Sequence, residues 1–169
     1  TPEKPGSRTW GNDIPRVVTW IKLTDRASGR PFYLFNTHWD HRHQPSREKA
    51  AKLIAARIDS RQDLNAPVIL LGDFNDLETN PAVSYLTGKP VTLDGSPASW
   101  PHGLIDTFQA LHPNAAARTT LHFWSADKSG TRKIDHILAS KGVEVLSAGI
   151  HDKPMVSDHF PVTAKVRFE

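Results

Sequence analysis

Short strand-like segments that end in polar residues are the feature of this 169-residue chain that most limits its fold. Residues 16–23 and 32–38 alternate in polarity or are rich in β-branched and aromatic side chains, as strands are, and the short turn between them predicts an antiparallel hairpin. Residues 67–72 form a continuous apolar run, which is typical of a strand buried on both faces. The 13 prolines and 10 glycines that punctuate the chain exclude a helical bundle or a coiled coil.

Helices are predicted only between such strands. Ser46, after Pro45, predicts the N-cap of a helix that continues to about residue 62. Asn80 and Pro81 predict a second, short helix up to Leu86. The remaining segments are expected to be a loop at 88–103, helical turns at 104–111, and strands at 133–139, 143–150 and 160–168. The chain is therefore expected to fold as one α+β domain over residues 1–169.

Composition excludes several classes of protein. A mean hydropathy of -0.45 and the absence of a long apolar run exclude a membrane-spanning helix. The absence of cysteine excludes disulfides, thiolate metal sites and thiol nucleophiles. The net charge of +3 comes from scattered basic residues, which favours phosphate-bearing ligands without requiring nucleic acid. The compartment stays open, since exported and cytoplasmic proteins both fit this composition.

Four polar segments lie at or beside the ends of predicted strands, where rigid scaffolds place catalytic groups. They are residues 36–41 (NTHWDH), 72–75 (GDFN), 133–136 (KIDH) and 157–162 (SDHFPV). Taken singly, each has a structural explanation. Asp73 and Asn75 fit an Asx-turn, and His38 fits a hydrogen-bonded structural histidine. Residues 157–159 fit a turn before the last strand.

Asp135 is harder to explain structurally, because a carboxylate among strand hydrophobics needs a partner, for which His159 and Arg132 are the candidates. Together, two histidines and several carboxylates without a Gly-x-Ser-x-Gly turn favour metal-assisted hydrolysis over acyl transfer. A transition-metal site is the less favoured alternative, because alternation along an extended segment divides its imidazoles between two faces. Its ligands would be His38, Asp40, His41 and His43.

In their order and separations, these four segments resemble the endonuclease/exonuclease/phosphatase superfamily, which has the DNase I-like fold. The resemblance implies an αββα sandwich, of which this chain would hold only the C-terminal sheet and its helices in full. It also implies a metal-dependent phosphoesterase that hydrolyses phosphodiesters or phosphomonoesters with an activated water, using Mg²⁺ or Mn²⁺. The alternative is a truncated, weak or inactive module that binds phosphate-bearing ligands or a partner.

The resemblance also implies a role for each catalytic side chain. Asp73 would orient and deprotonate the attacking water, and Asn75 would hold Asp73 and a phosphate oxygen. His159, supported by Asp135, would stabilise charge on the scissile phosphate. His38 would be a second phosphate ligand.

Further residues are expected around this centre. Asp158 would lie beside the metal. His41, Arg132 and Trp124 would contact the substrate, although His41 and Arg132 fit ordinary surface side chains equally well. Three aromatic side chains could stack on a base, although aromatic residues in such loops more often pack within the protein: Trp100, Phe123 and Trp124.

One departure from the family pattern qualifies these expectations. The family also uses an asparagine on its first strand and a glutamate from a Gln-Glu motif, and neither is present here. The chain therefore resembles the C-terminal part of such an enzyme and would lack about 100 residues. We expect it to bind magnesium weakly alone and to cover an open apolar sheet face by self-association or with the missing segment. The expected partner is a phosphate ester, with nucleic acid among the candidates.

Overall fold

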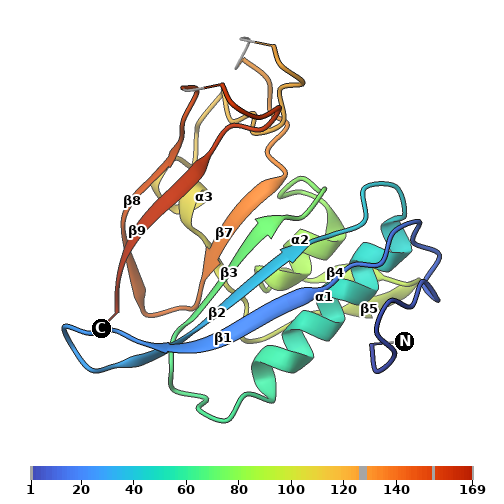
Figure 1. Cartoon of the computed structure of the whole chain (residues 1–169), viewed down its shortest axis with the longest axis horizontal. Coiled ribbons are helices and arrows are strands. Elements are labelled where there is room, and N and C mark those ends of the chain that lie inside the picture. The colour runs from blue at the N-terminus through green and yellow to red at the C-terminus, as the bar shows by residue number, and fades with distance from the viewer. Residues whose placement is uncertain (1, 126–128, 154, 169) are drawn as a thin grey trace.

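The computed structural model describes residues 2–125, 129–153 and 155–168 (Figure 1). Its larger elements are β1 (Val18–Thr24), β2 (Pro31–His38), α1 (Gln44–Asp59), β3 (Val68–Asp73), α2 (Pro81–Leu86), β7 (Asp135–Ala139), β8 (Val143–Ile150) and β9 (Val162–Phe168). Four shorter elements lie between α2 and β7: β4 (Val91–Leu93), β5 (Ser96–Ala98), β6 (Ile105–Asp106) and α3 (Thr107–Leu111). No helix in the described part of the chain is long and apolar enough to cross a membrane.

The central sheet has the strand order β1-β2-β3-β7-β6. β2 and β3 are parallel, while the other neighbours, including the predicted β1–β2 hairpin, are antiparallel. One face packs on α1 and α2, which lie together on the same side in Figure 1. This face carries the main core, in which Tyr33, Phe35 and Leu70 of the sheet are buried against Ile54 of α1.

The opposite face is covered only in part, by the separate β8–β9 hairpin (Figure 1). Val166 and Phe168 pack here beside a small cluster that includes Ile69. Leu34 is only partly buried, and Ile21, its partner on the edge strand β1, is 51% exposed. Because side chains alternate along a strand, the polar residues that end β2 and β3 point to this incompletely covered face.

The predicted N-cap of the first helix was wrong. α1 begins at Gln44 with His43 as its N-cap, and His43 Nδ1 accepts a hydrogen bond from the Ser46 amide. Ser46 lies inside the first turn, where its hydroxyl donates to the His43 carbonyl. The second helix does begin at Pro81 with Asn80 as its N-cap, as expected.

The segment 88–103 is not a continuous loop, because it contains the antiparallel β4–β5 hairpin. Its two turn residues, Asp94 and Gly95, both have positive φ, at 52° and 72°. Asp-Gly favours such a two-residue turn, so the signal was present in the sequence. β7 and β9 each begin two residues later than predicted, and residues 105–106 pair with β7 as a short strand before α3.

Candidate active site

The ends of three neighbouring strands bring the candidate catalytic residues to one edge of the sheet. In the parallel pair β2–β3, His38 lies opposite Asp73, and both are the last residues of their strands. β7 is antiparallel to β3, so its first residue, Asp135, lies opposite Asp73. His159 comes from the segment before β9 and forms an isolated β-bridge with Leu121. Segments far apart in the sequence therefore meet at one place.

The side chains of these residues form two contacting pairs. Nδ1 of His159 lies 2.8 Å from Oδ2 of Asp135, which is hydrogen-bond distance. Nε2 of His38 lies 3.3 Å from Oδ2 of Asp73. Of the two partners proposed for Asp135, the structure thus selects His159. Asp73, Asp135 and His159 each offer a ligand atom within 4.8 Å of the others, and all three are partly buried.

The backbone around Asp73 fixes its position. Gly72 has a φ of +137°, and a Cβ there would lie 1.9 Å from the Thr37 carbonyl oxygen, so only glycine lets β2 and β3 approach here. Asn75 has a φ of 50°; its amide donates to Oδ1 of Asp73 at 2.7 Å, and its Nδ2 donates to the Trp39 carbonyl at 2.9 Å. The Asx-turn therefore forms, and it holds one oxygen of Asp73 while the other faces His38.

Burial and hydrogen bonding shift the pKa values of Asp73, His38 and His159. Burial raises the pKa of Asp73, which makes this carboxylate a stronger base. Burial lowers the pKa of His38, although the charge of Asp73 opposes the shift. The hydrogen bond to Asp135 raises the pKa of His159. One imidazole is thus biased toward its neutral form and the other toward the cation, a separation suited to acid–base and charge-stabilising roles.

Asp73, Asp135 and His159 also fit a divalent metal ion. Two carboxylates and one imidazole are ligands that divalent metals accept, and the spacing of their atoms lets one ion contact all three. Asp158, which the resemblance would place beside the metal, is outside this group of three. Its carbonyl accepts a hydrogen bond from the His122 amide, and its Oδ1 lies 3.3 Å from the Ser157 hydroxyl. Its role as a ligand remains a prediction.

The predicted substrate residues lie in different places. Arg132 borders a pocket of about 670 Å³ together with Asn75, and its guanidinium lies 5.3 Å from the centre of the Phe123 ring. Trp124 is 62% exposed and is outside the residues that line this pocket. His41, in the loop after β2, has Nδ1 3.4 Å from a guanidinium nitrogen of Arg16.

Trp100 is a packing residue, which is the role that was favoured over base stacking. It is buried in the core, and its indole N–H donates to Asp59 at 2.9 Å. The transition-metal alternative finds no support among the described residues, because His38 contacts Asp73 and His43 caps α1 through Nδ1. Asp40 accepts the amides of Asp13, Arg42 and His43.

A buried polar network behind the sheet edge was missed in the sequence. Lys133 Nζ lies 2.7 Å from Asp106 Oδ2 and 2.8 Å from His136 Nδ1, and Lys133 and His136 are each 1% exposed. His136 Nε2 lies 2.9 Å from the carbonyl of Asp76, whose carboxylate pairs with Arg47 at 2.7 Å. The network thus supports the loop that follows Asp73. Lys133 and His136 lie in the polar segment 133–136, but no local pattern pairs them with Asp106, which lies 27 positions before Lys133.

Comparison with solved structures gives neighbours that share this fold. A mannosyl-6-phosphatase of Bacteroides thetaiotaomicron is 24% identical, with 96% of this chain and 61% of that chain covered and a TM-score of 0.75. A protein of Bacteroides vulgatus described as an endonuclease/exonuclease/phosphatase is 27% identical, with 95% and 58% covered and a TM-score of 0.74. The human nocturnin catalytic domain, solved with a sulfate anion, is 21% identical, with 91% and 53% covered and a TM-score of 0.68.

The chain therefore spans about three fifths or less of the length of these neighbours. They confirm the DNase I-like α+β architecture that the four polar segments predicted. A family model covers nearly the whole chain, from residue 2 to residue 159. Its members are phosphoesterases and nucleases, and this chain belongs to the endonuclease/exonuclease/phosphatase family.

Proposed function

We propose that this chain carries the main catalytic side chains of a metal-dependent phosphoesterase that hydrolyses phosphate esters with an activated water. The observation that carries the proposal is the meeting of His38, Asp73, Asp135 and His159 at one sheet edge. The pKa values of both histidines and of Asp73 are shifted, in different directions. Phosphoryl transfer needs this kind of site, since its catalysis is mostly positioning and electrostatic stabilisation of oxyanions.

Each side chain has a role that its surroundings support. Asp73, with its raised pKa and one oxygen fixed by the Asn75 amide, takes a proton from the attacking water. His159, oriented by Asp135 and biased toward its cation, donates to a phosphate oxygen where negative charge develops. His38 donates to a second oxygen. A Mg²⁺ or Mn²⁺ ion beside the carboxylates of Asp73 and Asp135 would supply further positive charge.

The proposal is tested with bis(p-nitrophenyl) phosphate and p-nitrophenyl phosphate as substrates, with Mg²⁺ or Mn²⁺ and with EDTA. We expect hydrolysis that requires the metal and that falls at least about 100-fold in Asp73→Asn and in His159→Ala. Asp63→Asn is the matched control, because this carboxylate only pairs with Lys22 at the surface, at 3.5 Å. Binding of phosphate without turnover would favour the alternative, a module that holds phosphate-bearing ligands.

We also propose that a further polypeptide layer, from self-association or from additional chain, covers the open sheet face. Ile21 and the partly buried Leu34 form apolar surface that the β8–β9 hairpin does not reach fully. Sedimentation velocity measures this directly: a dimer supports self-association, and a monomer leaves additional chain as the cover.

A further inference from the structure

A pocket of about 670 Å³ lies beside the proposed catalytic centre. Asn75, whose amide holds Asp73, forms part of its wall. The opposite wall is also tied to the centre, because Leu121 forms a β-bridge with His159 and the His122 amide donates to the Asp158 carbonyl. The volume suits a small organic molecule. A phosphate ester whose phosphate lies at the centre would direct its alcohol part into this space.

Two buried polar side chains in the pocket wall have no hydrogen-bond partner in the part of the chain that the structure describes. Both ring nitrogens of His122 are unpaired although the residue is only 5% exposed. Oγ1 of Thr119, in a residue 7% exposed, is also unpaired. Buried polar groups are nearly always hydrogen-bonded, so two unpaired ones in one pocket wall indicate a ligand that hydrogen-bonds to them.

Gly130 packs closely on Thr119. A Cβ at Gly130 would lie 2.5 Å from Thr119 Oγ1, too close for both atoms to stay in place. Gly130 itself lines the pocket, and its carbonyl accepts the amide of Arg118. A side chain at this position would therefore displace the Thr119 hydroxyl from its place in the wall.

The aromatic faces around the pocket are already used within the protein. The imidazole of His122 stacks on Phe160, with ring centres 4.0 Å apart and planes 18° apart. The guanidinium of Arg132 lies over the ring of Phe123. These aromatic rings already have stacking partners within the protein, whereas the polar atoms of His122 and Thr119 have no hydrogen-bond partner. The pocket wall therefore favours a hydroxyl-rich ligand over a flat base.

We propose, resting on the function proposed above, that His122 and Thr119 determine specificity for phosphate esters of a neutral, hydroxyl-rich alcohol such as a sugar. An imidazole always has an N–H to donate, and its neutral form also accepts, while a threonine hydroxyl does both. Sugar hydroxyl groups have the same dual capacity and match both side chains. Sites that hydrogen-bond a substrate hydroxyl discriminate strongly against analogues that lack it.

The test variant is His122→Phe, which keeps a ring for Phe160 and removes both nitrogens. We expect KM for glucose 6-phosphate to rise about 10-fold, with kcat/KM for p-nitrophenyl phosphate unchanged. The melting temperature without ligand should equal or exceed that of the wild type, because two unpaired polar atoms are removed from the interior. If His122 had only a structural role, His122→Phe would have a lower melting temperature, and its kcat/KM would fall equally with both substrates.

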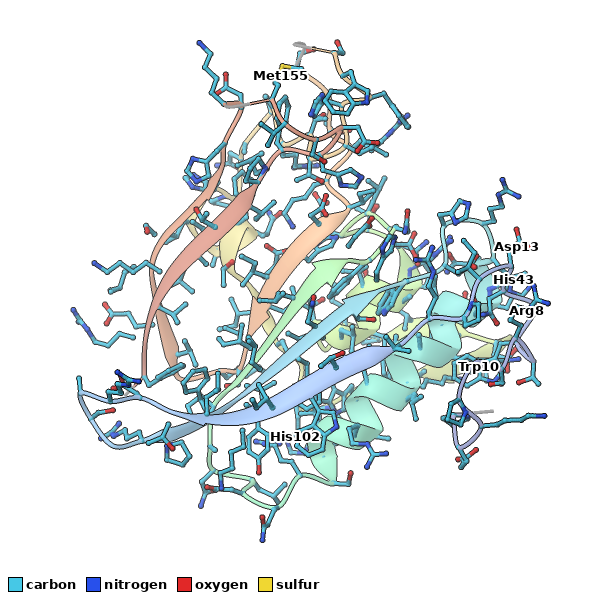
Figure 2. The ribbon with its side chains drawn as sticks, in the orientation of Figure 1. Arg8, Trp10, Asp13, His43, His102 and Met155 are labelled. Atoms are coloured by element: carbon cyan, nitrogen blue, oxygen red, sulfur yellow. The ribbon has the colours of Figure 1, made fainter. Side chains whose placement is uncertain are left out.

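His102→Phe is the control, since His102 lies at the far end of the molecule from Met155 (Figure 2) and is outside the residues that line the pocket. Gly130→Ala is the second variant and should also raise KM for the sugar phosphate. Equal KM values for glucose 6-phosphate in wild type and His122→Phe would overturn the proposal. A larger effect of the variant on KM for adenosine 5′-monophosphate than for the sugar phosphate would also overturn it.

If no ester is hydrolysed, the proposed function fails. The change in melting temperature on adding glucose 6-phosphate then tests whether the pocket binds the sugar phosphate. A stabilisation by glucose 6-phosphate that His122→Phe removes supports the pocket assignment, whereas no stabilisation refutes it.

Discussion

Replacement of Gly72 by alanine tests whether the contact between β2 and β3 positions the catalytic residues. A Cβ at this residue would lie 1.9 Å from the Thr37 carbonyl oxygen. Ordinary carbon–oxygen contacts are no shorter than about 3.3 Å, so the two strands would have to separate by about 1.4 Å. His38 and Asp73 are the next residues on the two strands, and their 3.3 Å contact would not survive such a shift.

The expected loss of stability follows from two contributions. Overpacking of this kind destabilises proteins by about 1–3 kcal/mol. Forcing an L-residue to a φ of +137° costs about 1–3 kcal/mol more. Gly72→Ala should therefore lower the free energy of unfolding by about 2–6 kcal/mol, a large part of the about 5–15 kcal/mol that a domain has. Urea denaturation measures this change, and hydrolysis of bis(p-nitrophenyl) phosphate measures the loss of alignment.

Gly95→Ala is the matched control. Gly95 also has a positive φ, of +72°, but its Cβ would meet nothing within 4 Å. Gly95→Ala should lower the free energy of unfolding only by the backbone contribution, about 1–2 kcal/mol, and should keep full activity. The reasoning is refuted if Gly72→Ala is no less stable than Gly95→Ala, or if it folds and hydrolyses substrate at the wild-type rate.

Three further changes probe the interior. Lys133→Met should lower the unfolding free energy in urea by about 3–5 kcal/mol, because it leaves the buried carboxylate of Asp106 without its ammonium partner; a loss below about 1 kcal/mol would contradict the ion pair. Burial raises the pKa of Asp76 from 3.8 to about 6 despite the Arg47 partner. The folded state therefore binds this proton more tightly, and stability falls by up to about 3 kcal/mol as pH rises from 3.8 through 6. Asp76→Asn should remove that fall from the pH dependence of urea denaturation, and an unchanged pH profile would refute the shift. Trp100→Phe should cost about 1–2 kcal/mol through loss of its hydrogen bond and volume, while KM values stay unchanged, which a substrate-stacking role would not allow.

Local sequence pattern predicted the positions of several site residues, because polar motifs coincide with the ends of predicted strands. Parallel pairing of β2 and β3 sets His38 beside Asp73, and both endings were visible as an apolar run that stops at a polar residue. Pairing of β3 with β7 was not visible, since it joins residues more than 60 positions apart. The resemblance to a family, rather than periodicity, supplied that long-range information for Asp135 and His159.

The errors have physical causes that local pattern does not reveal. His43 caps α1 through a ring nitrogen, whereas capping preferences point to serine hydroxyls such as that of Ser46. Lys133 is buried because Asp106 and His136 surround its ammonium, and both partners come from pairing that only the fold creates. Packing was the favoured role for Trp100, but its partner was not predicted, because only the fold brings this Pro/Gly-rich segment back onto α1.

The partly open sheet face connects the chemistry of the site to its packing. Burial is the first cause of the raised pKa of Asp73 and of the lowered pKa of His38, and both side chains lie on the face that the β8–β9 hairpin covers incompletely. A further layer over that face would remove more water from both groups. It would therefore push each pKa further in its present direction, making Asp73 a stronger base and His38 more firmly neutral. The layer that completes the core would then also tune the catalytic groups.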